Sequence, residues 1–312
     1  MFETIFVSPF VEMWEYPYFF IEVLISGLLT GVMYSLVALG FVLIFKASGV
    51  FNFSQGVMVL FSALTIVGLM EYGMPVWLAI LLTMVVMIGL AYSVERLVLR
   101  PLVNQEHIIM FMATIGLTYF LDGFGQLVWG SDVKSFAFQL PNSNFELGPN
   151  GEVFVNQLDV VAGATAAILV AVLAVFFQKT KIGRALRAVA DDHQAALSVG
   201  IPLNQIWVIV WSVAGVVAIV AGIMWGAKVT VQFSLSLIAL KALPVLILGG
   251  FTSIPGAIVG GLIIGAGEKI AENFWGPAFG GAIEDWFAYM LALVFLLFRP
   301  QGLFGEKIIE RV

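Results

Sequence analysis

A series of long apolar runs constrains this chain more than any other feature of its sequence. The runs contain few charged residues and cover residues 19–45, 56–70, 75–94, 108–129, 158–178, 205–226, 235–250, 254–271 and 284–298. A helix needs about 20 apolar residues to cross a bilayer, and in lipid only helices or closed barrels satisfy the backbone. The runs do not alternate as barrel strands would. They predict an all-α fold, a polytopic membrane helical bundle of about 8–9 transmembrane segments.

The composition supports one membrane-embedded domain over residues 1–312. Apolar residues make up 61% of the chain and charged residues 11%, whereas soluble domains contain about 45–50% and 25%. There is no cysteine, which excludes disulfides. The first apolar run follows Glu3, Glu12 and Glu15 and has no basic segment before it, so we interpret it as a retained span and not as a cleaved signal peptide.

The basic residues indicate an orientation. A polar island at residues 179–204 lies between two apolar runs. If this island is cytoplasmic, most Lys and Arg residues fall on the same side and most Asp and Glu residues fall outside. We therefore expect the N-terminus outside and the C-terminus in the cytoplasm. The seventh run is interrupted by Pro244, Gly249 and Gly250, which would suit a broken or re-entrant segment.

Another long polar connection, residues 130–157, is extracytoplasmic in this topology. Its tail, NFELGPNGEVFV, alternates around residues 148–151 and predicts a small β-hairpin with a four-residue turn. Such a hairpin would offer a contact point to an extracytoplasmic partner. A plain solvated loop is the alternative.

The island KTKIGRALRAVADDHQAALSVGIPLN contains the start and stop signals of a short helix from about Asp192 to Val199. Asp191 can accept N–H groups of the first turn, and Gln194 can reach back to the N–H of Asp191, as in a capping box. Gly200 suits the left-handed residue that ends a helix. A helix this short is not stable alone, so it must lie against another surface.

The expected helix offers a face of small side chains. Ala195, Ala196 and Val199 fall together at i, i+1 and i+4, which allows another surface to approach closely. The alternative is an ordinary amphipathic connector between two membrane helices.

Three stretches in or beside the apolar runs carry small or polar residues that could serve packing or transport. The first run has a face for close helix packing, formed by Gly27, Gly31, Ser35 and Gly40. The second run begins with a group of polar residues and a glycine, Asn52, Ser54, Gln55 and Gly56. This group suggests a helix break that faces protein or a water-filled path. The alternative is a capped loop at the cytoplasmic surface. Residues 238–268 contain glycines and a proline that suit tight helix crossing near the path, and its candidate residues are Lys241, Gly249, Gly250, Ser253, Pro255 and Gly256.

Lys241 is a cation inside an apolar run. An isolated cation there costs about 2.5–3.5 kcal/mol on insertion scales, so it should face the bundle interior or snorkel. We favour a structural or gating ion pair over a solute ligand. For the glycines nearby we favour a structural role over solute contact.

Four motifs, in order along the chain, resemble those of branched-chain amino acid ABC permeases. GVFNFSQG is similar to the Asn-Phe-Ala-(His/Gln)-Gly signature of that family, and LKALPVLILGGFTSIPGAIVGG to its glycine-rich stretch. QAALSVG resembles the Glu-Ala-Ala-x-x-x-Gly loop of ABC-importer permeases, with Gln194 in place of Glu, and FRPQGLFG resembles the family's usual end. The order of the motifs and the single cytoplasmic loop resemble the smaller, LivH-type permease. Ser54, Val57 and Pro244 depart from it near the presumed path.

The resemblance implies a permease subunit of a bacterial inner-membrane importer that works by alternating access. Its partners would be a second homologous permease, two cytoplasmic ATPase subunits and an extracytoplasmic solute-binding protein. ATP and Mg would be bound by the ATPases, with no cofactor, metal or catalytic residue in this chain. The resemblance assigns ATPase coupling to Arg184, Arg187, Asp191, Asp192, Gln194, Ala195, Ala196 and Gly200.

Other functions remain possible from the residues alone. The same class of permease could move urea, a short amide or another small carboxylate. An ion-coupled secondary transporter would need intramembrane acids, but Glu95 and Asp122 lie near the ends of their runs, where pairing or snorkelling is expected. An enzyme would need His, Asp or Glu residues clustered at one membrane depth, and the sequence shows no such cluster. The two histidines, His107 and His193, are expected at cytoplasmic edges as solvated residues.

Overall fold

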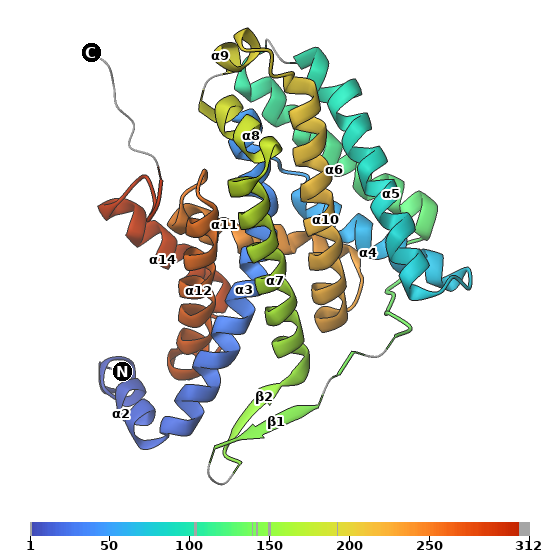
Figure 1. Ribbon diagram of the computed structural model, residues 1–312. Coiled ribbons are helices and arrows are strands. Elements are labelled where there is room, and N and C mark those ends of the chain that lie inside the picture. The colour runs from blue at the N-terminus through green and yellow to red at the C-terminus, as the bar shows by residue number, and fades with distance from the viewer. Residues whose placement is uncertain are drawn as a thin grey trace. The chain divides into compact units, whose positions relative to one another are not determined.

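The computed structural model describes residues 2–102, 105–138, 140–141, 143–148, 151–191 and 193–305. Each apolar run forms one helix (Figure 1), which confirms the expected helical class. These helices are α3 (Pro17–Ser48), α4 (Gln55–Glu71), α5 (Val76–Val94), α6 (His107–Trp129), α7 (Gln157–Lys179), α10 (Leu203–Val229), α11 (Ile238–Gly249), α12 (Ile254–Ile270) and α14 (Glu284–Phe298).

Within the described residues, 6 helical segments are long and apolar enough to cross a membrane. They are Pro17–Ser48, Val76–Leu102, Ile108–Trp129, Gln157–Lys179, Leu203–Val229 and Ile254–Phe279. The helices of the remaining runs, α4, α11 and α14, are shorter. Eight or nine spans, and the orientation, therefore stay predictions.

The chain divides into two compact units. Unit 1 comprises Met1–Ser35, Leu140–Ala167 and Lys241–Val312, and unit 2 comprises Leu36–Gln139 and Ile168–Leu240. The boundaries fall within α3, α7 and α11, each of which is one continuous helix. The expected single domain over residues 1–312 stays a prediction.

In unit 1, α3 packs on α12 through glycines. A Cβ at Gly31 would lie less than 3.0 Å from the carbonyl oxygen of Gly261, and a Cβ at Gly27 would lie 2.8 Å from the Cα of Ala266. Ser35 follows on the same face, and its Oγ donates to the carbonyl oxygen of Gly31 at 2.9 Å. The small-residue face predicted for the first run is thus confirmed for its part in unit 1.

The predicted hairpin is also present in unit 1. β1 (Asn144–Leu147) pairs antiparallel with β2 (Val153–Asn156). The N–H of Phe154 donates to the carboxylate of Glu22 on α3 at 2.9 Å, which ties the hairpin to that helix. The strand pairing excludes a plain loop for these two segments. Residues 149–150 of the expected turn lie outside the described residues.

Two short helices that we did not predict precede α3. They are α1 (Phe2–Phe6) and α2 (Ser8–Glu15). Trp275 fastens them to unit 1, because its indole N–H donates to the carbonyl oxygen of Ile5 at 3.0 Å and its ring packs edge-on against Phe10, with 5.5 Å between ring centroids.

In unit 2, α4 is the central buried helix. Its residues from Gln55 to Gly68 are buried, and it packs against α5, α6, α10 and η3 (Phe233–Leu237). A helix that is apolar on all sides belongs in the core of such a bundle.

The expected interruption of the seventh run at Pro244 is wrong. α11 continues through this proline and ends at Gly249. The missing N–H of one proline removes one helical hydrogen bond, which here does not end the helix. The chain turns at Gly250, whose φ of 101° favours glycine.

Candidate functional site

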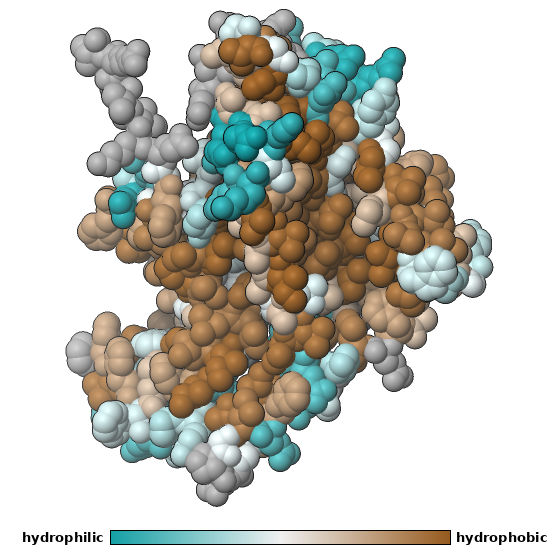
Figure 2. Space-filling model, in the orientation of Figure 1, coloured by the Kyte–Doolittle hydropathy of each residue, from teal (hydrophilic) through white to brown (hydrophobic). Residues whose placement is uncertain are grey.

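The polar island forms two helices, not the single one expected. α8 (Lys181–Asp191) occupies the basic stretch, and α9 (His193–Ser198) follows it. The buried residues of α8 are Gly183, Leu186 and Val189, at every third position. Figure 2 shows hydrophilic residues gathered over this helix. The spacing of these three residues, one at every third position, was a sequence signal for α8. We overlooked it because charged residues dominate this stretch.

Two hydrogen bonds stabilise the turn between α7 and α8. Thr180 caps α8, because its Oγ1 accepts the N–H of Gly183 at 3.1 Å. Arg187 donates from Nη1 to the carbonyl oxygen of Phe177 at 2.6 Å and so satisfies a carbonyl at the end of α7. The side chains of Arg184 and Arg187 are both exposed. A displacement of α8 should therefore reach α7 directly.

α9 ends as the sequence predicted. Gly200 has a φ of 83°. Its N–H donates to the carbonyl oxygen of Leu197 at 3.0 Å, and the N–H of Ile201 donates to that of Ala196 at 3.0 Å. These two bonds form a Schellman motif, which confirms Gly200 as the left-handed stop residue.

The small face of α9 differs from the expected one. Ala195 is exposed and Val199 is 74% exposed, but Ala196 is only 2% exposed and packs inward. A partner could therefore contact Ala195 and Val199, not Ala196. Outside the described part of the chain lie Asp192 and the side chains of Asp191, Gln194, His107 and His193. The expected capping box stays a prediction.

The side chains of the polar stretch at the start of α4 are buried, and its place at membrane depth stays a prediction. Asn52, Ser54 and Gln55 are each 0% exposed. The Oδ1 of Asn52 accepts the N–H of Ser54 at 3.1 Å and its hydroxyl at 2.6 Å, an Asx turn that leads into α4. At Gly56 the helix touches η3, since a Cβ there would lie less than 3.0 Å from the carbonyl oxygen of Ser236.

The glycine-rich turn between α11 and α12, in unit 1, is a close backbone crossing. Ser253 caps α12 by accepting the N–H of Gly256 at 3.0 Å, and Pro255 lies in the first turn. A Cβ at Gly249 would lie less than 3.0 Å from the carbonyl oxygen of Gly256. Together with the left-handed Gly250, this geometry supports a structural role for these residues.

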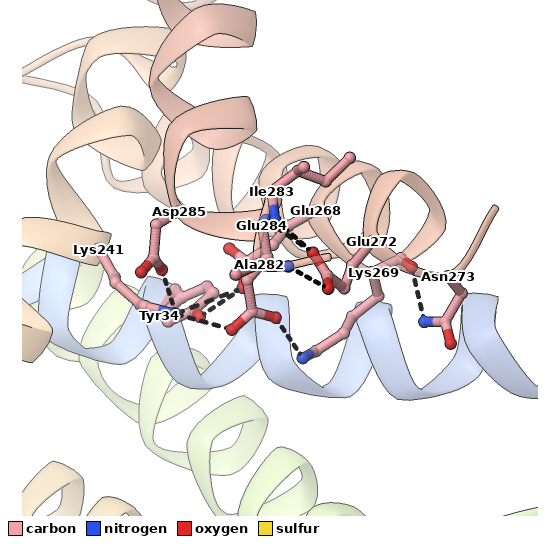
Figure 3. A network of polar contacts seen from close by, with 10 residues as sticks. All are labelled: Tyr34, Lys241, Glu268, Lys269, Glu272, Asn273, Ala282, Ile283, Glu284 and Asp285. Carbon is pink, nitrogen blue, oxygen red and sulfur yellow. Dashed lines mark hydrogen bonds and ion pairs between the residues drawn. The ribbon is translucent and has the colours of Figure 1, made fainter. Parts of the chain in front are cut away.

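Lys241 lies among carboxylates in unit 1 (Figure 3). Its Nζ is 2.7 Å from Oδ1 of Asp285, 3.2 Å from Oε1 of Glu284 and 3.7 Å from Oε1 of Glu268. Glu268 is 1% exposed and also accepts the hydroxyl of Tyr34 at 2.9 Å. Ionisable groups at membrane depth are usually paired in this way. The arrangement favours the structural or gating ion pair over a solute ligand.

Further contacts extend this network. The Nζ of Lys269 is 2.8 Å from Oε2 of Glu284. The carboxylate of Glu272 accepts the N–H groups of Ala282, Ile283 and Glu284 at 2.8, 2.6 and 3.0 Å, and so caps the start of α14. The network therefore joins α3, α11, α12 and α14 in unit 1.

Two buried acidic residues in or next to apolar runs, Glu95 and Glu268, are paired with basic side chains. Glu95 is 1% exposed and lies 3.2 Å from Nε of Arg100, which confirms the expected pairing. Glu268 carried the same signal, an acid within an apolar run. We did not single it out from the sequence, nor Tyr34 and Lys269.

Comparison with known proteins matches most of the chain to one family. The family model for the permease component of branched-chain amino acid transport systems matches residues 23–299. The high-affinity branched-chain amino acid transport system permease protein BraD of Pseudomonas aeruginosa is 30% identical over 309 residues, which cover 95% of this chain and 99% of BraD.

Two further relatives extend the comparison. LivH of Escherichia coli K12, also named as a branched-chain amino acid permease protein, is 28% identical over 307 residues, or 94% of this chain and 98% of LivH. The fructose import permease protein FruG of Bifidobacterium longum is 23% identical over 264 residues, or 80% of this chain and 74% of FruG. The family match and these nearly full-length similarities show that the chain is a membrane permease subunit and belongs to the family of branched-chain amino acid transport system permeases.

Proposed function

We propose that this chain is the transmembrane permease subunit of an ATP-binding-cassette importer that moves branched-chain or related amino acids inward by alternating access. The observation that carries this proposal is the similarity to BraD and LivH over nearly the full length of all three chains. The chain lies in the bacterial inner membrane with about 8–9 spans and its N-terminus outside.

The importer also contains a second homologous permease, two cytoplasmic ATPase subunits and an extracytoplasmic solute-binding protein. The ATPases bind ATP and Mg and hydrolyse the nucleotide, while this chain changes shape and catalyses no reaction. Closure of the ATPases displaces α8 and α9. The hydrogen bond from Arg187 to the carbonyl oxygen of Phe177 supports transfer of this displacement to α7.

We assign the stretch Asn52–Gly56 in unit 2 to the solute path, and we give the glycine-rich stretch with Lys241 in unit 1 a structural or gating role. The burial of Asn52 and Gln55 supports this assignment, because buried polar side chains in membrane proteins often mark pathways.

Purification of the chain from its native membrane tests the proposal. We expect a second permease and the ATPases to purify with it, and we expect an amino-acid-loaded binding protein to stimulate ATP hydrolysis. A chain that purifies alone and moves solute into liposomes without ATP would instead be a secondary transporter.

Ala195→Asp is expected to uncouple the importer. A charge on the exposed face of α9 should weaken ATPase binding by about 2 kcal/mol or more, or about 30-fold, because interface residues of this kind tolerate charge poorly. Uptake and ATPase affinity in proteoliposomes measure the effect. Ala137→Asp, at an exposed alanine of the loop before β1, is the matched control. Normal uptake by Ala195→Asp would remove the docking role of α9.

A second candidate function keeps the importer and changes the solute. The similarity to FruG, which is named as a fructose import permease, favours this alternative. Binding proteins loaded with leucine, urea, a short amide or fructose can be compared in the same ATPase assay, and the one that stimulates hydrolysis identifies the solute class.

A further inference from the structure

Gln55 carries an amide that is fully buried and has no hydrogen-bond partner among the described residues. Its side chain is 0% exposed, and both Oε1 and Nε2 are unpaired. A glutamine amide offers two donors and an acceptor with two lone pairs. Leaving such a group unpaired in the interior is costly, and each case in a native structure needs an explanation. A role for Gln55 in another conformation provides one.

The polar groups around Gln55 are paired, so the unpaired amide is particular to this side chain. The N–H of Phe53 donates to Oγ1 of Thr114 at 3.1 Å. The hydroxyl of Ser54 donates to Asn52 at 2.6 Å, and the backbone N–H of Gln55 itself donates to the carbonyl oxygen of Asn52 at 3.3 Å. The loop before α4 therefore satisfies these groups and leaves the Gln55 amide unsatisfied.

Gly40 of α3 provides the space in which the amide lies. A Cβ at Gly40 would lie 2.5 Å from Cδ of Gln55 and 3.0 Å from its Oε1, so any other residue at position 40 would displace the amide. The contact lies within unit 2. The amide thus occupies the space left by the absent side chain of Gly40, and no complementary polar groups from the described part of the chain surround it.

We propose that the Gln55 amide is a solute-binding group of the transport path, covered by Gly40 in the conformation seen here and uncovered when the path opens. This inference rests on the proposed transport function. Once uncovered, the amide donates to a carboxylate and accepts from an ammonium, the two charged groups of an amino acid zwitterion. Within the described ranges the amide has no hydrogen-bond partner while it is covered, and it gains partners when solute binds. Solute binding therefore favours the open conformation of the path.

The variant Gln55→Met distinguishes this role from a merely structural one. Methionine has a side chain of similar length and removes the unpaired amide atoms, so the purified importer should unfold at the same or a higher temperature. Uptake should nevertheless fall at least about tenfold, because a path group that bonds the solute is lost. Uptake at the wild-type rate by a stably assembled Gln55→Met importer would overturn the proposal.

The lack of cysteine in this chain permits a second test. In Gln55→Cys, assembled with cysteine-free partner subunits in nanodiscs, a thiol reagent should label little at rest and much more during ATP hydrolysis with loaded binding protein. Thr65→Cys is the control, because Thr65 lies on the same helix and is 2% exposed. Labelling of Gln55→Cys that does not rise during turnover, or that rises equally in Thr65→Cys, would overturn the proposal.

ATP-dependent uptake by the wild-type importer distinguishes a failure of the proposed transport function from a failure of the role proposed for Gln55. If it shows no ATP-dependent uptake, the proposed function fails and this inference falls with it. If it transports and Gln55→Met transports equally well, only the role of the Gln55 amide is wrong.

Discussion

Lys241→Met is expected to lower the free energy of unfolding by about 3 kcal/mol. The substitution leaves Glu268, which is 1% exposed, without the ammonium 3.7 Å from its carboxylate. Removing one partner of a buried ion pair costs about 3–5 kcal/mol. We expect the lower end, because the side chain of Lys241 is itself 31% exposed. Thermal and denaturant unfolding of the purified protein, followed by circular dichroism, measure the loss.

Two variants test the electrostatic cause. Lys241→Arg keeps the positive charge and should lose much less stability. Glu268→Gln in the Lys241→Met background removes the uncompensated charge and should restore a large part of the loss, while its amide can still accept the Tyr34 hydroxyl. If Lys241→Met unfolds like the wild type, or if the added Glu268→Gln restores nothing, the ion pairs do not stabilise unit 1.

Features set by neighbouring residues could be predicted from the sequence. An apolar run of sufficient length forms a helix wherever it packs, so each run has its helix in the structure. The hairpin and the stop at Gly200 were also predictable, because turn and cap residues act within a few positions. The α3 glycines could be recognised from their spacing, although their partners on α12 could not.

Features that depend on distant partners could not be predicted in the same way. Tyr34 and Glu268 are 234 residues apart, so nothing near either residue specifies their hydrogen bond. The burial of Gln55 likewise depends on Gly40 of the preceding helix. The inward packing of Ala196 arises from tertiary contacts, since its neighbours Ala195 and Leu197 are equally suited to that position and are exposed.

Gly265→Ala is expected to destabilise the protein by about 2–3 kcal/mol through separation of α12 from α3. The new Cβ would lie less than 3.0 Å from the carbonyl oxygen of Gly27 and the Cα of Gly31. These are backbone atoms, so no side chain can rotate away. Gly267→Ala on the same helix is the matched control, because its Cβ would meet only the side-chain ends of Leu291 and Phe287, at 3.3 and 3.5 Å. Equal unfolding temperatures for the two variants would contradict this close crossing.

The same displacement should weaken the bond between Tyr34 and Glu268. The 2.9 Å hydrogen bond between Tyr34 and Glu268 joins α3 to α12, so a wider separation of these two helices lengthens it. Tyr34→Phe should therefore cost less stability in the Gly265→Ala background than in the wild type. A double-mutant cycle measures this coupling, which we expect to be about 0.5–1.5 kcal/mol, the usual net value of one hydrogen bond. Additive effects would show that the glycine crossing and the polar network stabilise unit 1 independently.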